Sequence, residues 1–118
     1  MTIKNKEDKE LIVDKLLITK RKGHNLEIDL MFKEMEADAK KVKTKTNKLS
    51  KKVDSLLAAL MQDWIGSAKL TIESIKKTNE NLQKTIRDIK KDVEVAKNIV
   101  KAIGYLDDVI MIAANLLA

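Results

Sequence analysis

The second half of the chain carries a heptad repeat, in which apolar residues recur at alternating steps of three and four. Twelve of its fourteen positions are apolar, and the two exceptions are Asn79 and Asp107. This spacing keeps the apolar side chains on one side of an α-helix, where they must be buried against other helices. The positions are Ile72, Ile75, Asn79, Leu82, Ile86, Ile89, Val93, Ala96, Val100, Ile103, Asp107, Ile110, Ala114 and Leu117.

A second repeat with the same steps occupies the first half, and it is out of phase with the other across residues 60–72. Gly66 is suited to end a helix there, and Ser67 to cap the next one. A reversal at this point gives an antiparallel helical hairpin, whereas the alternative is one unbroken helix with a stutter. The first-half positions are Ile28, Phe32, Met35, Ala39, Val42, Thr46, Leu49, Val53, Leu56 and Leu60.

The composition favours long helices over sheets. Proline is absent, only three residues are glycine, and 36% are charged. We therefore expect an all-α fold: one elongated helical domain over residues 1–118, built on a long antiparallel hairpin or coiled coil with arms 25–63 and 67–118. Helix rise makes each arm about 75–90 Å long. Residues 1–22 form either a short third helix or an extension, because Gly23 is a candidate break.

The two most apolar pieces of the chain, residues 11–18 and 99–118, meet at the open end of such a hairpin. In the second piece 15 of 20 residues are apolar, and a helix that is apolar all round needs cover. A third helix, a second hairpin completing a four-helix bundle, or a membrane could provide it. We expect a homo-oligomer, with a dimer favoured, or a helical protein partner. The predicted interface residues are Leu16, Ile103, Leu106 and Ile110.

Two polar residues interrupt the second repeat. Asn79 either fixes the register of packed helices by hydrogen bonding, or lies hydrated near the turn. Asp107 lies in the most apolar region, where a buried carboxylate is costly unless it is paired. It either pairs with a cation or acts as a pH-sensitive latch that loosens on protonation. The candidate cations are Lys15, Lys20, Arg21 and Lys22.

A lysine-rich segment lies in the middle of the first arm, and the net charge of +6 comes mainly from residues 1–60, which have 15 basic and 10 acidic side chains. At about 100° per residue, six of its lysines fall within an arc of about 140°. This lysine face keeps the bundle soluble, neutralises nucleic-acid phosphates, or contacts anionic lipid. Its residues are Lys40, Lys41, Lys45, Lys48, Lys51 and Lys52.

Catalytic and cofactor chemistry is not indicated. The chain has no cysteine and one histidine, His24, whose spacing to Glu27 does not repeat as bundle metal sites require. The serines have no nearby candidate base, and no glycine-rich phosphate loop occurs. We therefore expect neither an enzyme nor a cofactor or metal site.

The sequence thus predicts a non-enzymatic helical interaction and assembly protein. The first alternative is a membrane-active amphipathic protein, either a surface binder or one similar in outline to α-helical pore-forming toxins, a resemblance of architecture that involves no motif. The second is non-specific nucleic-acid binding through the lysine face. Because we find no signal peptide, cysteine or clear transmembrane segment, we expect a cytoplasmic location.

Overall fold

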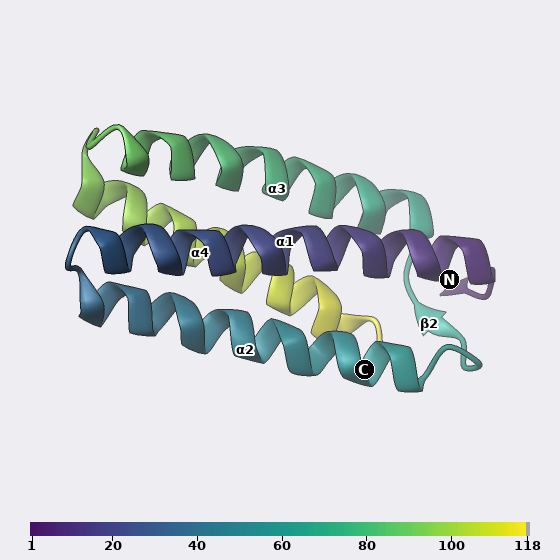
Figure 1. The fold of residues 1–118 in the computed structure, drawn as a ribbon. Helices are drawn as coiled ribbons and strands as arrows, with labels where there is room; N and C mark the ends of the chain where they lie inside the picture. The colour runs from purple at the N-terminus through teal and green to yellow at the C-terminus, as the bar shows by residue number, and fades with distance from the viewer. Residues whose placement is uncertain (118) are drawn as a thin grey trace.

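The protein folds as a four-helix bundle in the computed structural model, which describes residues 1–117 (Figure 1). Two antiparallel hairpins, α1–α2 and α3–α4, lie side by side, so that α1 packs against α2 and α3, and α4 packs against the same two helices. The prediction of an all-α bundle is confirmed. The helices are α1 (Lys6–Phe32), α2 (Glu36–Ala58), α3 (Ala68–Lys90) and α4 (Val95–Asn115).

The predicted continuous arms are wrong, because each is divided by a tight turn. The bundle measures 44 × 22 × 19 Å, which is too short for arms of about 75–90 Å. The chain turns between α1 and α2, and again at residues 91–94. Both turns use left-handed backbone conformations at residues other than glycine: Glu34 has φ 59°, Asp92 58° and Glu94 39°. Lys33 donates a hydrogen bond to Asp92, which joins the two turns.

No break occurs at the candidate position Gly23, since α1 runs unbroken through it. This glycine serves a close helix contact instead. A Cβ atom at Gly23 would lie 2.7 Å from Thr46 Oγ1 on α2 and 3.4 Å from Leu106 Cδ2 on α4. The absence of a side chain therefore lets α1 approach α2 closely.

The chain reverses between residues 60 and 72, as predicted, and the reversal contains a short strand. β2 (Trp64–Ile65) pairs antiparallel with β1 (Thr2–Ile3) near the start of the chain. Ser67 caps α3, with its Oγ accepting from the amide of Leu70 at 3.3 Å. Gly66 does not terminate α2, which ends at Ala58; it has φ 113° between β2 and α3.

A buried lysine and a buried tryptophan hold this connection against the bundle. Lys9 Nζ donates to the carbonyl oxygens of Leu60 at 2.8 Å and Gln62 at 2.5 Å, and it lies 5.7 Å from the Trp64 ring centroid. Trp64 Nε1 donates to the carbonyl of Ala59 at 2.9 Å. These donors bond three backbone carbonyls of the segment that follows α2.

The two apolar pieces of the sequence meet within one chain. Ile12 and Leu16 on α1 share a core cluster with Val109 and Ala113 on α4. A second cluster, nearer the two tight turns, joins all four helices. The apolar end that was expected to need a second chain is therefore covered in part by the chain itself.

The face of α4 that is buried differs from the one predicted. The predicted repeat positions on α4 are exposed or half-buried, and Val100 is 72% exposed. The repeat does not continue through the turn at 91–94, and a helix that is apolar nearly all round can bury either of two stripes. The buried stripe is Ile99, Ala102, Leu106, Val109, Ala113 and Leu116.

Candidate functional site

The predicted repeat positions of α4, which the fold leaves exposed or half-buried, form a second apolar stripe. This stripe includes Ile110 and Ala114 and lies beside the lysine face of α2. Between these helices are two hollows of about 300 and 260 Å³, which share Lys52 and Ser55 as lining residues. Together they form the α2–α4 groove, with lysines on one wall and apolar side chains on the other. Its lining residues are Lys48, Lys51, Lys52, Ser55, Ile110, Ala113, Ala114 and Leu117.

One ion pair also links α2 to α4. Lys45 Nζ lies 2.8 Å from Asp107 Oδ1, and the Asp107 side chain is 48% exposed. Pairing of Asp107 with a lysine was predicted, but the expected partners on residues 15–22 are wrong, because α4 packs beside α2 and lies diagonally across from α1. The carboxylate is hydrated, so the burial on which the latch hypothesis rested is absent.

The four predicted interface residues divide between the core and the surface. Leu16 and Leu106 are fully buried inside the single chain and are inaccessible to a partner. Ile103 and Ile110 are half-buried on the uncovered stripe of α4, and Ile110 lines the groove. The accessible pair therefore lies seven residues apart on one helix.

The lysine face is exposed, except at the residue paired with Asp107. Lys45 is half-buried, and the other five side chains point to solvent: Lys40, Lys41, Lys48, Lys51 and Lys52. Of these, Lys48, Lys51 and Lys52 line the α2–α4 groove. The structure thus brings a predicted basic face next to Ile110, one of the predicted interface residues, a contact between distant parts of the chain that the sequence did not indicate.

Asn79 is buried between α3 and α1, not hydrated near the turn. Its Oδ1 accepts from Thr19 Oγ1 at 2.5 Å, and its Nδ2 donates to the backbone carbonyl of Lys15 at 3.1 Å. A buried amide bonded on both sides favours one alignment of two helices. Here the aligned helices belong to the same chain.

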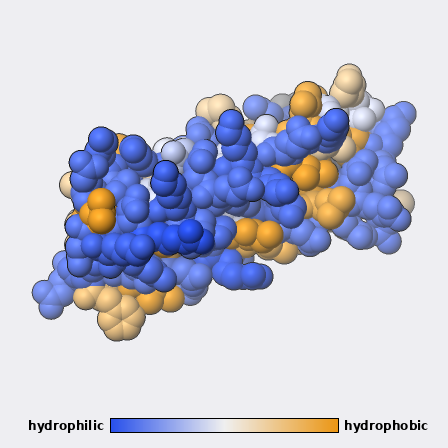
Figure 2. Space-filling model, turned by 90° about the horizontal axis from the view of Figure 1, so that it is seen from above, coloured by the Kyte–Doolittle hydropathy of each residue, from blue (hydrophilic) through white to orange (hydrophobic). Residues whose placement is uncertain are grey.

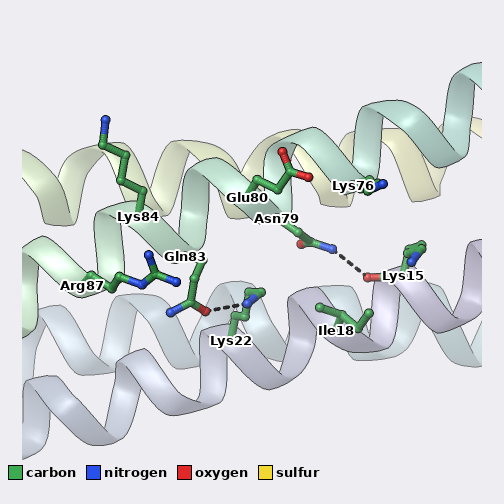
Figure 3. Close-up of a pocket in the computed structure, with 9 residues that line it drawn as sticks. All are labelled: Lys15, Ile18, Lys22, Lys76, Asn79, Glu80, Gln83, Lys84 and Arg87. Atoms are coloured by element: carbon green, nitrogen blue, oxygen red, sulfur yellow. Dashed lines mark hydrogen bonds between the residues drawn. The ribbon is translucent and has the colours of Figure 1, made fainter.

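A larger hollow of about 460 Å³, the α1–α3 cleft, lies over Asn79 (Figure 3). Figure 3 shows Gln83 and Arg87 reaching from α3 toward Lys22 on α1, while Lys84 and Glu80 extend away from α1. Lys22 Nζ donates to Gln83 Oε1 at 2.5 Å. The cleft is lined by Lys15, Ile18, Lys22, Lys76, Asn79, Glu80, Gln83, Lys84 and Arg87.

Burial lowers the pKa of Lys22 from its usual 10.5, and the positive charges of Arg87 and Arg21 lower it further. Sequence reasoning missed this cleft. Its residues flank the apolar stripes, at steps of seven from Lys15 to Lys22 and from Lys76 to Gln83. That spacing indicates two polar helix edges, but it does not indicate that the two edges face each other.

Within residues 1–117, no group of three or more histidine, cysteine or acidic residues is placed to hold a metal ion. His24 Nδ1 lies 3.9 Å from Glu27 Oε1, on the surface of α1. None of the helices within residues 1–117 combines the length and the apolar character needed to cross a bilayer.

The helix pairs α2–α4 and α1–α3 form opposite sides of the bundle, so the groove and the cleft are separate surfaces. Comparison with known proteins adds no assignment to either surface: no protein-family model, no curated protein and no solved structure matches the chain.

Proposed function

We propose that this protein is a non-enzymatic helical interaction protein whose α2–α4 groove binds an acidic amphipathic helix of another protein. One observation carries the proposal: an apolar stripe of α4 that the fold leaves uncovered runs beside exposed lysines of α2. Within residues 1–117, Lys48, Lys51 and Lys52 make no ion pair. Their charges are therefore free to meet carboxylates of a partner.

The spacing along α4 suits a helix as the occupant. Ile103 and Ile110 are seven residues apart on α4, or about 10.5 Å of helix rise. A partner helix with its own heptad repeat presents apolar anchors at the same interval. The apolar contact supplies affinity, while the lysines on the other wall select acidic flanks and speed association.

Charge separates this partner from the other candidates. A second copy of the chain would place one lysine face near another, since residues 1–60 carry the surplus of basic side chains. Nucleic acid would use the lysines through its phosphates but would leave the apolar stripe uncovered. An anionic membrane could contact both walls, so it is the alternative that the experiment must separate.

A labelled synthetic helix with leucines at heptad positions and glutamates on both flanks tests the proposal by fluorescence anisotropy. The same helix with lysine flanks is the ligand control. We expect only the acidic helix to bind, and Ile110→Asp and Lys52→Glu each to weaken its binding at least about tenfold. Met111→Asp, at an exposed position of α4 outside the groove, and Lys77→Glu on α3 should change the affinity less than about twofold.

Three results would contradict the proposal. The acidic helix could fail to bind, both helices could bind equally, or the control variants could lose as much affinity as the groove variants. Co-sedimentation with phosphatidylserine vesicles that depends on Ile110 would favour the membrane instead. Light scattering behind size exclusion gives the mass of the free protein, and a dimer that Ile110→Asp dissociates would make the occupant a second copy.

A further inference from the structure

The α1–α3 cleft gathers positive charge that no carboxylate of the described chain neutralises. Lys15, Lys22, Lys76 and Arg87 line it, and none of the four makes an ion pair with any residue of 1–117. The one acidic lining residue, Glu80, extends away from α1 together with Lys84 (Figure 3). The face seen in Figure 2, which looks down on α3, is predominantly hydrophilic.

Bringing these cations together is unfavourable without an anion. Burial and the neighbouring guanidinium groups of Arg87 and Arg21 lower the pKa of Lys22, so its charged form is less stable here than in water. Its hydrogen bond to Gln83 Oε1 supplies only a neutral acceptor. A bound anion would relieve the repulsion and replace part of the lost hydration.

The packing of the two helices fixes the backbone positions from which the cations extend. Asn79, at the floor of the cleft, is bonded to Thr19 and to the Lys15 carbonyl, which fixes α3 against α1. Lys15 and Lys22 are therefore presented from one wall and Lys76 and Arg87 from the other. The fixed helices place the four charges around one hollow, and the exposed side chains of Lys76 and Arg87 become ordered when the anion binds.

We propose that the α1–α3 cleft binds a compact polyphosphate, with Lys15, Lys22, Lys76 and Arg87 as its cationic contacts. The volume of about 460 Å³ lies in the usual range for small-molecule sites. Four cations around so small a space require several negative charges on a compact body, which phosphate groups provide. Arginine binds phosphate in bidentate fashion, while lysine contributes a point charge. No aromatic residue lines the cleft, so a nucleobase would find no stacking platform.

Such a ligand could be a soluble polyphosphate or the headgroup of a polyphosphorylated lipid, and the probes distinguish the two. Calorimetry with inositol hexakisphosphate and with inorganic tripolyphosphate measures soluble binding. Co-sedimentation with vesicles containing phosphatidylinositol 4,5-bisphosphate, set against phosphatidylserine vesicles, measures headgroup binding. We expect saturable one-to-one binding of at least one polyphosphate probe, weakened by salt.

Matched variants locate the site. Lys22→Gln and Arg87→Gln should each lower the affinity at least about tenfold, because each removes a charge inside the cleft. Lys77→Gln on α3 and Lys51→Gln on α2 remove the same charge outside it and should change the affinity less than about twofold. Circular dichroism checks that all four variants are folded.

The absence of saturable binding to every polyphosphate probe would overturn the proposal. Equal losses in the cleft and control variants would also overturn it, because they would show attraction by net charge alone. Binding to bisphosphate vesicles without binding of the soluble probes would assign the cleft to a lipid headgroup. Since the α2–α4 groove lies on the other side of the bundle, Ile110→Asp should leave polyphosphate binding unchanged.

Discussion

Replacing Gly23 by alanine tests the close approach of α1 and α2, and the magnitude follows from the structure. The new Cβ would lie 2.7 Å from Thr46 Oγ1, about 0.7 Å closer than an ordinary contact. Thr46 cannot rotate freely out of the way, because its Oγ1 donates to the carbonyl of Val42 at 2.9 Å. Crowding of this kind costs about 1–3 kcal/mol, against a gain of about 1 kcal/mol in helix propensity.

Gly104→Ala is the matched control. Gly104 lies within α4, and a Cβ there would meet no atom within 4 Å among the described residues. The same substitution should therefore raise the free energy of unfolding by about 0.5–1 kcal/mol through helix propensity alone. The free energy of unfolding of Gly23→Ala should be about 1–3 kcal/mol lower than that of Gly104→Ala.

Urea denaturation of both variants measures the difference, with constant m-values confirming that only stability has changed. Adding Thr46→Ala to Gly23→Ala removes the crowding Oγ1 atom. In the Thr46→Ala background, Gly23→Ala should therefore raise the free energy of unfolding through helix propensity. The reasoning fails if Gly23→Ala and Gly104→Ala stabilise the protein equally. It also fails if Thr46→Ala leaves the effect of Gly23→Ala unaltered, because the crowding would then not involve that hydroxyl.

Three further predictions concern charged residues. Lys9→Met should lower the free energy of unfolding by about 2 kcal/mol or more, because it removes two hydrogen bonds from a charged donor to the part-buried carbonyls of Leu60 and Gln62. Lys6→Met on the surface should change it by less than about 0.5 kcal/mol, and thermal melts measure both effects. Asp107→Asn breaks only the half-exposed pair with Lys45, so we expect a loss below about 1 kcal/mol and an unchanged mass in light scattering; altered assembly would support a latch. Because the folded-state pKa of Lys22 lies below 10.5, its contribution to stability is present above pH 10.5 and lost as the pH falls through that folded-state pKa. Denaturation at about pH 8 and pH 11 measures the free energy of unfolding of the unmodified protein and of Lys22→Gln. The unmodified protein should lose more stability at the lower pH than the variant, and an identical pH dependence of the two would contradict the prediction.

The sequence predicts the buried side correctly for the two helices in which one repeat stays within one helix. The stripe from Ala39 to Leu56 is buried along α2, and that from Ile75 to Ile89 along α3. In both cases polar residues fill the opposite side, so only one face can be buried. Periodicity alone is then sufficient to assign the buried side.

The two tight turns could not be read from the sequence, because their residues carry no common turn signal. Glycine, asparagine and aspartate are the residues expected at positive φ, and of Glu34, Asp92 and Glu94 only Asp92 is of such a type. A left-handed conformation costs a residue with a side chain about 1–2 kcal/mol. Burial of apolar faces along two hairpins outweighs that cost, and this gain depends on contacts between residues distant in sequence.

The position of the turn at residues 91–94 also determines which surfaces remain for function. Continuous arms would have buried Ile103 and Ile110, and the lysine face would have had no apolar neighbour. Because the chain reverses, α4 buries the stripe that contains Leu106 and leaves the other beside the lysines of α2. On the other side of the bundle α3 packs against α1, which brings the cations of the α1–α3 cleft together. Both candidate sites therefore result from the topology of the bundle and not from any local motif, which is why motif analysis of this sequence identified neither.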